Sequence, residues 1–326
     1  MSGDLGPRVA ISAAQKFASL YADVDLLLFG NEQQLLELTS TKKLLKRRIT
    51  IVHAPELVAM SDDPIHALRH KKDSSMWLAL DAVRAGNADA CVSAGNTGAV
   101  LAIAKYLVKT IGDIERPAIC KSMPVEKGET FMLDLGANIH CAPEQLHQFA
   151  LMGQVLAMRD ANPHPRVSLL NIGRESSKGT ELVRAAQELI SADNRINYAG
   201  FIEPNCIFSG TTDVIVCDGF TGNIALKSSE GAAQFIARKI RNLLTKNILS
   251  RLLALPLWPL LKKLRKDMNP DMYNGASFLG LRKTVVKSHG NANKKAFLQA
   301  LKLAREQVIQ KVPERIEAQI VQKIAT

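Results

Sequence analysis

The hydrophobic positions of this chain follow two alternating patterns. Short runs rich in Val, Ile and Leu predict buried strands, and they occupy residues 25–29, 49–52, 88–92, 131–135, 167–170 and 214–216. Longer segments of helix-forming composition predict helices over residues 8–20, 32–38, 99–110, 228–240 and 293–325, with Pro313 as a break in the last. Strands that alternate with helices in this way predict an α/β fold with a doubly wound, largely parallel sheet and right-handed crossovers.

Four of the predicted strands end in a turn of glycine and small polar residues. These turns begin at Ser93, Asp134, Asn171 and Asp218, and two further glycine-bearing turns are expected at 273–281 and 285–290. Glycine lets the backbone approach a ligand, and the first turn of the following helix offers unpaired N–H groups to an anion. One such turn is equally well an ordinary connection. Their recurrence favours turns that converge on one ligand crevice at the carboxyl ends of the strands.

None of these turns carries the motif of a nucleotide-binding, metal or covalent enzyme. The sequence lacks a GxGxxG fingerprint, a Walker A loop, an HExxH pair and a GxSxG elbow. No cysteine is set beside a histidine that has a clear orienting partner. We therefore expect no metal and no cofactor, and nothing in the sequence supports a covalent acyl-enzyme.

The overall charge narrows the class of partner. Among 326 residues, 42 Lys and Arg against 31 Asp and Glu give a formal net charge of +11. Such an excess indicates an acidic partner: nucleic acid, an anionic membrane or an acidic protein. Aromatic residues make up only 5% of the chain and no nucleic-acid motif is present, so we expect no nucleic acid partner.

Length and cysteine content favour a cytosolic protein of one domain. A chain of 326 residues with 47% hydrophobic residues can bury one large core, and we expect a single domain over residues 1–326. The five cysteines are widely spread and lack a CxxC pair, which indicates buried, reduced thiols. The amino terminus has no apolar signal core, and no apolar run reaches the roughly 20 residues that span a bilayer.

Residues 236–266 differ from the rest of the chain in charge, because they include nine basic residues and no acidic one. Apolar residues recur along this segment at helical spacing, at Ile236, Ile240, Leu243, Leu244, Ile248, Leu252 and Leu255. A Pro-broken apolar patch with Trp258 follows. The pattern predicts a protruding basic amphipathic tip at about 236–268, which packs against a partner subunit or contacts an anionic membrane surface. A dimer that projects this tip would do both.

Five blocks, in this order, resemble the PlsX family of phosphate acyltransferases. They are SAGNTGA at 93–99, DLGAN at 134–138, NIGRESSKGTEL at 171–182, DGFTGN at 218–223 and KSHG at 287–290. The opening MSGDLGP also resembles a family loop. Family members carry a strand of the Leu-Asp-Ala type ahead of that loop, so we expect either a start assigned too late or a copy without its first strand.

The resemblance implies a fold similar to phosphotransacetylases and isopropylmalate-type dehydrogenases. It also implies an activity: transfer of a fatty acyl group from acyl carrier protein to inorganic phosphate, which gives acyl phosphate for phospholipid synthesis. Family members are homodimeric cytosolic enzymes that associate peripherally with the membrane. Acyl carrier protein is acidic, and it would account for the positive charge of this chain.

The resemblance also assigns site residues. Lys178 matches the catalytic lysine of the family and Asn223 its catalytic asparagine. The candidate phosphate and pantetheine contacts are Ser93, Asn96, Thr97, Asn138, Gly222 and His289, the last also for proton delivery. Because phosphate is already a nucleophile, such a site has only to hold it in line, stabilise the oxyanion and help the thiolate leave. Two alternatives stay open: an acyl-CoA-dependent phosphotransacylase, and a membrane-binding scaffold without activity.

Overall fold

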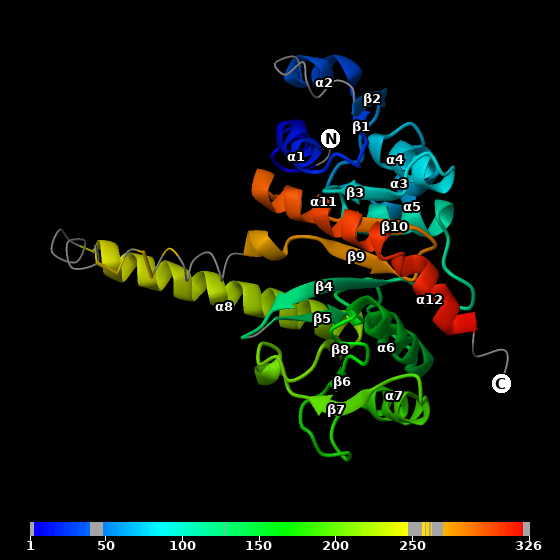
Figure 1. The fold of residues 1–326 in the computed structure, drawn as a ribbon, viewed down its shortest axis with the longest axis vertical. Helices are drawn as coiled ribbons and strands as arrows, with labels where there is room; N and C mark the ends of the chain where they lie inside the picture. Colours follow the sequence, from blue (N-terminus) through cyan, green and yellow to red (C-terminus); the bar gives the residue numbers. More distant parts are fainter. Residues whose placement is uncertain are drawn as a thin grey trace.

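The computed structural model describes residues 3–39, 48–126, 128–246, 256–257, 259–260, 262 and 270–321 (Figure 1). Within these ranges two strands form a small parallel sheet, β1 (Leu26–Gly30) and β2 (Ile49–His53). Eight strands of the described chain form the main sheet: β3 (Ala90–Ser93), β4 (Ala118–Pro124), β5 (Glu129–Leu133), β6 (Val167–Leu170), β7 (Tyr198–Ile202), β8 (Val214–Val216), β9 (Ala276–Leu279) and β10 (Thr284–Lys287). Their order is β3-β10-β9-β4-β5-β8-β6-β7.

Helices cover both faces of the main sheet. They are α1 (Pro7–Leu20), α2 (Glu32–Thr39), α3 (Pro64–His70), α4 (Ser75–Arg84), α5 (Thr97–Leu107), α6 (Pro143–Ala157), α7 (Glu181–Ala192), α8 (Gly219–Thr245), α11 (Lys294–Ile309) and α12 (Val312–Val321). Side chains alternate between the faces along each strand. Phe131 and Leu133 pack in the core with α6, α7 and α12, whereas Met132 packs in the core with α4 and α5. The predicted doubly wound α/β fold is confirmed.

The predicted elements differ from the structure at three places. The helix after β8 begins at Gly219 instead of 228, since the Asp218 side chain caps it. The carboxyl-terminal helix breaks at Lys311, whose φ is 50°, and Pro313 follows as the second residue of α12, where proline is tolerated. Residues 276–279 and 284–287, expected within glycine-bearing turns, form β9 and β10.

Strand direction separates the predicted turns into two groups. Three successive strand pairs are antiparallel: β10 with β9, β9 with β4 and β4 with β5. As a result β5 runs in the direction opposite to β10. β3 runs parallel to β10, while β8 and β6 run parallel to β5. The carboxyl ends of β3 and β10 therefore lie at one edge, and those of β5, β8 and β6 lie at the opposite edge. The expectation that all the turns meet at one edge is wrong.

Shared helices join the two-stranded sheet to the main one. Helix α4 contacts both β1 and β3, and α1 packs on α11. Between β1 and β3 lies a cavity of about 600 Å³, whose walls include Gly3 and every residue from Leu26 to Phe29 and from Ala90 to Ser93.

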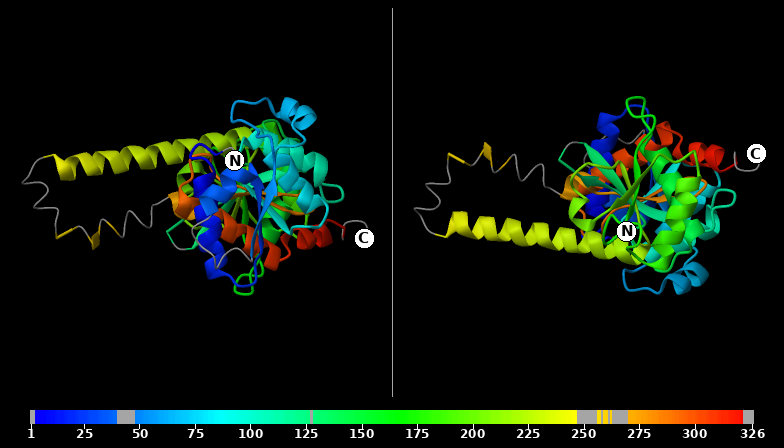
Figure 2. Two further views of the ribbon diagram at one scale, coloured as in Figure 1. Left: turned by 90° about the horizontal axis from the view of Figure 1, so that it is seen from above. Right: turned by 90° about the horizontal axis from the view of Figure 1, so that it is seen from below.

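Helix α8 protrudes from the body of the protein (Figures 1 and 2). Its 27 residues span about 40 Å at the α-helical rise. Phe235, Ile236, Ile240 and Leu243 are exposed on its outer half, beside the exposed cations Arg238 and Lys239. Most of the predicted tip beyond Lys246, including Trp258, lies outside the described residues. No helix in the described part of the chain is long and apolar enough to cross a membrane.

A half-buried charge cluster ties α6, α7 and α12 together. The Asp193 carboxylate accepts hydrogen bonds from Arg195 Nε at 2.8 Å and Arg195 Nη2 at 2.5 Å. Its Oδ2 lies 2.8 Å from His147 Nε2 on α6. Arg195 Nη1 donates to Gln319 O on α12 at 2.6 Å. Asp193 and Arg195 together therefore connect the end of α7 to α6 and α12.

We expect Asp193→Asn to lower the free energy of unfolding by about 1–3 kcal/mol at neutral pH. The hydrogen bond from Arg195 holds the pKa of Asp193 well below its ordinary value. A depressed folded-state pKa contributes stability above the unfolded value, about pH 4, and that stability is lost as the pH falls further. In thermal unfolding, the melting temperatures of the two proteins should therefore differ at pH 7 and converge toward pH 2.

The matched control for this prediction is Asp160→Asn. Asp160 is exposed, so its loss should leave the melting temperature unchanged at both pH values. Equal destabilisation by Asp193→Asn at high and low pH would contradict the proposed charge contribution.

Candidate active site

The turn after β5 is built around one buried carboxylate. Asp134 is fully buried and accepts hydrogen bonds from the backbone N–H groups of Ile119 at 2.8 Å, Ala137 at 3.1 Å and Asn138 at 2.6 Å. Burial raises the pKa of Asp134, and these donors oppose the shift. Asn138 Nδ2 donates to Asp134 at 3.0 Å and to Pro117 O at 2.9 Å. The Asn138 amide, a predicted substrate contact, thus holds the turn.

The first turn of α8 lies directly on this β5 turn. Gly219 N donates to Asn138 O at 2.8 Å, and Asp218 Oδ1 accepts from Thr221 N at 2.9 Å. The Asp218 carboxylate thereby places a negative charge where an incoming anion would meet the helix N-terminus. The amino termini of α5 and α7 are likewise capped by their own side chains, Asn96 and Thr180.

The glycines of this turn serve close packing. A Cβ added at Gly222 would lie 2.0 Å from Asp134 O and 2.8 Å from Cys217 Sγ. A Cβ at Gly219 would lie 2.6 Å from Asn138 O. Both contacts are far inside normal van der Waals separation, so only glycine lets α8 approach the β5 turn.

We expect Gly222→Ala to destabilise the protein by about 1–3 kcal/mol or more, because the backbone of Asp134 cannot move away cheaply. Chemical denaturation measures the loss. Gly231→Ala on the same helix is the control, since nothing lies within 4 Å of a Cβ built there. The packing role would be refuted by an unchanged denaturation midpoint for Gly222→Ala.

Lys178 lies in the turn after β6, the strand next to β8 in the sheet. Its side chain is exposed, and its stem passes over Gly173, where an added Cβ would lie 3.2 Å from Lys178 Cγ. The buried Asn171 donates through Nδ2 to Lys178 O at 3.2 Å. Gly179 adopts a φ of 90°, and a Cβ there would lie 2.2 Å from Asn171 Oδ1. Asn171 and Gly179 together fix the backbone that carries the lysine.

Asn223 lies on the second turn of α8, over the β5 turn. A Cβ added at Gly136, whose φ is 120°, would lie 3.5 Å from Asn223 Cβ and Cγ. Because β6 pairs directly with β8, the turns that carry Lys178 and Asn223 leave the same edge of the sheet from neighbouring strands. The predicted catalytic pair thus lies in one region.

The other predicted contacts lie at the opposite edge. Ser93 Oγ accepts from Gly95 N at 3.2 Å, and Thr97 is exposed at the first turn of α5. Asn96 Nδ2 donates to Met60 O at 2.9 Å and to Asp62 O at 3.0 Å, while its Oδ1 accepts from Ala99 N at 3.0 Å. Asn96 is therefore engaged in holding the α3–α5 region.

The KSHG block lies beside Ser93. Ser288 N donates to Ser93 O at 2.8 Å. The buried Asn274 orders the block, because its Nδ2 donates to Ser288 Oγ at 2.8 Å and its Oδ1 accepts from His289 N at 3.1 Å. The His289 side chain is half exposed. Burial lowers the pKa of His289, and the cations of Lys121, Lys287 and Lys227 act in the same direction against Glu230.

Helix α8 connects the two edges. Glu230, seven residues after Asn223, lies with its Oε1 3.0 Å from Lys121 Nζ on β4 and 3.9 Å from His289 Nε2. Positions seven apart share one face of a helix. The α8 face that begins at Asn223 thus runs along the sheet to the KSHG block, and one elongated region joins the two groups of predicted residues.

Three cysteines of this region are buried, which disfavours a role as nucleophile. Burial raises the pKa of the Cys217 thiol, and the carboxylates of Asp134 and Asp218 add to the shift. Burial likewise raises the pKa of Cys91 to about 12. Cys91, Cys120 and Cys217 are buried as predicted, whereas Cys141 and Cys206 are only partly buried.

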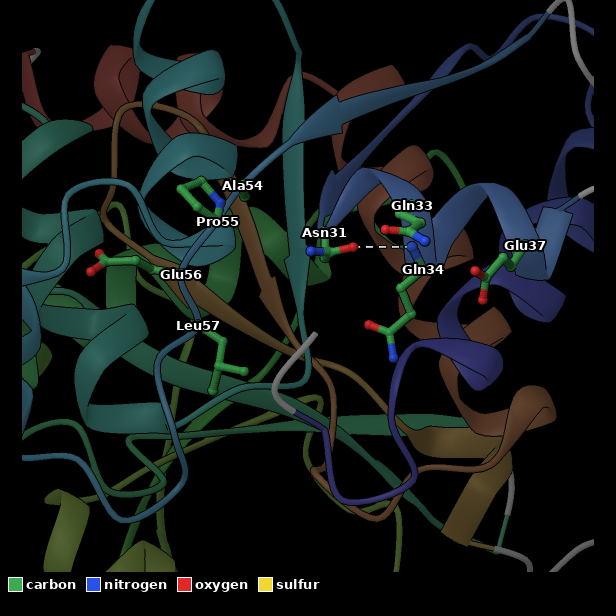
Figure 3. A pocket seen from close by; sticks show the side chains of 8 residues that line it. All are labelled: Asn31, Gln33, Gln34, Glu37, Ala54, Pro55, Glu56 and Leu57. Atoms are coloured by element: carbon green, nitrogen blue, oxygen red, sulfur yellow. Dashed lines mark hydrogen bonds between the residues drawn. The ribbon is translucent and has the colours of Figure 1, made fainter.

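A separate polar pocket lies between α2 and the segment after β2 (Figure 3). It has a volume of about 440 Å³, and Asn31, Gln34, Glu37 and Glu56 are among the residues that line it. Asn31 Oδ1 accepts from Gln34 N at 3.0 Å. Among the described residues two carboxylates line the pocket, and none of the predicted site residues belongs to it.

Comparisons with known proteins match this arrangement of motifs. A model of the family described as "Fatty acid synthesis protein" covers residues 1–315. A phosphate acyltransferase of Cellvibrio japonicus is 57% identical over 321 residues, which are 98% of this chain and 96% of that protein. A phosphate acyltransferase of Shewanella woodyi is 47% identical over 323 residues, with 98% and 94% covered.

The chain belongs to the PlsX family of phosphate acyltransferases. It is therefore an acyltransferase that transfers acyl groups with phosphate, and the predicted resemblance is confirmed. A phosphotransacetylase of Streptococcus pyogenes has the same fold, with a TM-score of 0.61 at 17% identity over 93% of this chain and 91% of that chain.

Three residues of this phosphate acyltransferase escaped the sequence reasoning: Lys121, Glu230 and Asn274. A lysine inside the apolar run 118–124 was the available signal for Lys121, since a buried lysine is rare without a partner. For Glu230 the signal was its helical spacing from Asn223. Asn274 carried no local signal, because its hydrogen bonds are all to residues at least 14 positions away.

Proposed function

We propose that this protein transfers a fatty acyl group from acyl carrier protein to inorganic phosphate, and that the acyl phosphate feeds phospholipid synthesis. The observation that carries the proposal is the pair Lys178 and Asn223, which leave neighbouring strands of a phosphate acyltransferase at the same edge of the sheet. The attack of phosphate on a thioester needs both groups: a cation that binds the nucleophile and an amide donor that stabilises the oxyanion.

In the proposed reaction a phosphate oxygen attacks the thioester carbonyl directly. Lys178 neutralises the phosphate and holds it in line, and the Asn223 amide donates to the carbonyl oxygen as negative charge develops there. The C–S bond then breaks, and the carrier leaves as a thiolate that takes up a proton from water. The burial of Cys91, Cys120 and Cys217 supports this direct route, because buried neutral thiols do not form acyl-enzymes.

The proposed macromolecular partners are acyl carrier protein, an anionic membrane surface and a second copy of the chain. The net charge of +11 suits an acidic carrier. The exposed apolar and basic residues of the outer half of α8 suit a membrane head-group region or a partner subunit. We propose a single-domain, cytoplasmic, peripherally membrane-associated homodimer.

The test is release of free carrier thiol from palmitoyl-acyl carrier protein with and without phosphate, with acyl phosphate detected as product. The proposal expects thiol only when phosphate is present. Palmitoyl-coenzyme A is the parallel donor, and turnover of that thioester alone would favour a coenzyme A-dependent phosphotransacylase. Binding to anionic vesicles with neither donor consumed would favour a scaffold instead.

A further inference from the structure

The region where α8 meets the KSHG block contains more buried positive charge than the reaction scheme uses. Lys121 and Lys287 are each at least nine-tenths buried, with exposed fractions of 5% and 8%. They project from β4 and β10, and the cations of both act on His289. Burying a charged lysine costs folding free energy unless an anion compensates the charge. The partners of each lysine therefore matter.

Lys287 lacks a carboxylate partner among the described residues. Its Nζ donates to the backbone carbonyl of Ser288 at 2.5 Å, and no ion pair involves it within the described ranges. Burial lowers the pKa of Lys287 to about 8, and the negative charge of Asp4 opposes that shift only in part. The side chain is a cation held in place with unused hydrogen-bonding capacity.

Lys121 has one carboxylate partner, and that partner is shared. Glu230 Oε1 lies 3.0 Å from Lys121 Nζ and 3.9 Å from His289 Nε2. The Glu230 side chain is about one-third exposed, at 29%, and that of His289 is exposed at 51%. The Glu230 carboxylate thus lies between the buried Lys121 and the partly exposed His289.

We propose that Lys121, Lys287 and His289 form a binding site for a phosphate group, which displaces the Glu230 carboxylate from Lys121. Two ammonium groups and an imidazole offer charge-assisted donors from separate elements, β4, β10 and the turn after β10. The turn is held by Asn274, so the site is ordered before the ligand arrives. A carboxylate that already lies in the site marks where an anion is stable.

Two sources could supply this phosphate group. Both are substrates of the proposed function, so the proposed site rests on that function. One is the inorganic phosphate that attacks the thioester, and the other is the phosphodiester of the carrier's pantetheine arm. Inorganic phosphate alone and free 4′-phosphopantetheine are therefore used as separate probes. Binding of inorganic phosphate that Lys121→Gln weakens assigns a phosphate position apart from Lys178, and binding of only the second probe assigns the arm's site.

The experiment titrates each probe into the protein by calorimetry, with no acyl donor present. We expect Lys121→Gln to weaken binding at least about tenfold, the scale of losing one charged hydrogen bond. Glu230→Gln should change affinity in the opposite direction and tighten binding several-fold, because the competing carboxylate is gone. Lys239→Gln removes the same charge from the outer part of α8 and should leave binding unchanged.

A second readout follows the His289 imidazole by NMR as the pH is varied. A bound phosphate should raise the pKa of His289, because its negative charge counters the fields of Lys121, Lys227 and Lys287 beyond what Glu230 and Asp4 provide. The site is overturned if neither probe binds, if Lys121→Gln binds as tightly as the unaltered protein, or if Glu230→Gln weakens binding. Acyl transfer is scored separately, so a protein that turns over without this binding pattern disproves only the site.

Discussion

Lys178→Ala is expected to lower acyl transfer to phosphate at least about 100-fold, the scale of losing one electrostatic stabiliser of a transition state. The side chain is exposed and contributes little packing, so folding should be intact. The lysine charge is required twice in the proposed reaction, when the phosphate dianion is held and when negative charge spreads to the carbonyl oxygen. Phosphate-dependent release of carrier thiol measures the loss.

Two companion variants make this result specific. Lys178→Arg keeps the charge but changes the donor geometry, and it should recover part of the activity. Arg174→Ala removes another exposed cation from the same turn, whose Nε lies 3.7 Å from Glu203 Oε2. This substitution should change turnover by less than about threefold. Near-normal turnover by a folded Lys178→Ala protein would reject the assignment of Lys178.

Asn223→Asp is expected to lower turnover by about 100- to 1000-fold, with little change in the melting temperature. The substitution preserves the shape of the side chain above Gly136, but a carboxylate cannot donate a hydrogen bond and repels the developing oxyanion. Removing one oxyanion donor costs this much in enzymes that stabilise acyl-transfer intermediates. Turnover at saturating phosphate isolates this step from phosphate binding.

The control for Asn223→Asp is Ser228→Asp, which adds the same charge to an exposed position one and a half turns further along α8. It should leave turnover within about twofold, since five residues turn the new carboxylate about 140° round the helix from Asn223. A comparable loss in both variants would show that charge on α8, rather than the amide of Asn223, controls the rate.

Several features of the site follow from local sequence alone. The apolar run Val214–Val216 predicts β8, and it contains all the residues of that strand in the structure. Lys178 and Asn223 could be assigned because the motif blocks around them are contiguous and resemble one family. Features of this kind depend on neighbours within one or two turns of chain, which a single sequence displays.

The sequence by itself thus predicted six of the ten described strands and the family, and the resemblance assigned Lys178 and Asn223. Only the tertiary structure decided how they combine. β9 and β4 lie antiparallel within the sheet, so the predicted turns leave opposite edges and α8 has to join them. Lys121 and Glu230 are 109 positions apart and pair at 3.0 Å, and Gly219 and Gly222 pack closely against the Asp134 turn. Strand direction and side-chain contact depend on segments distant in sequence, and no local pattern encodes which of them will meet.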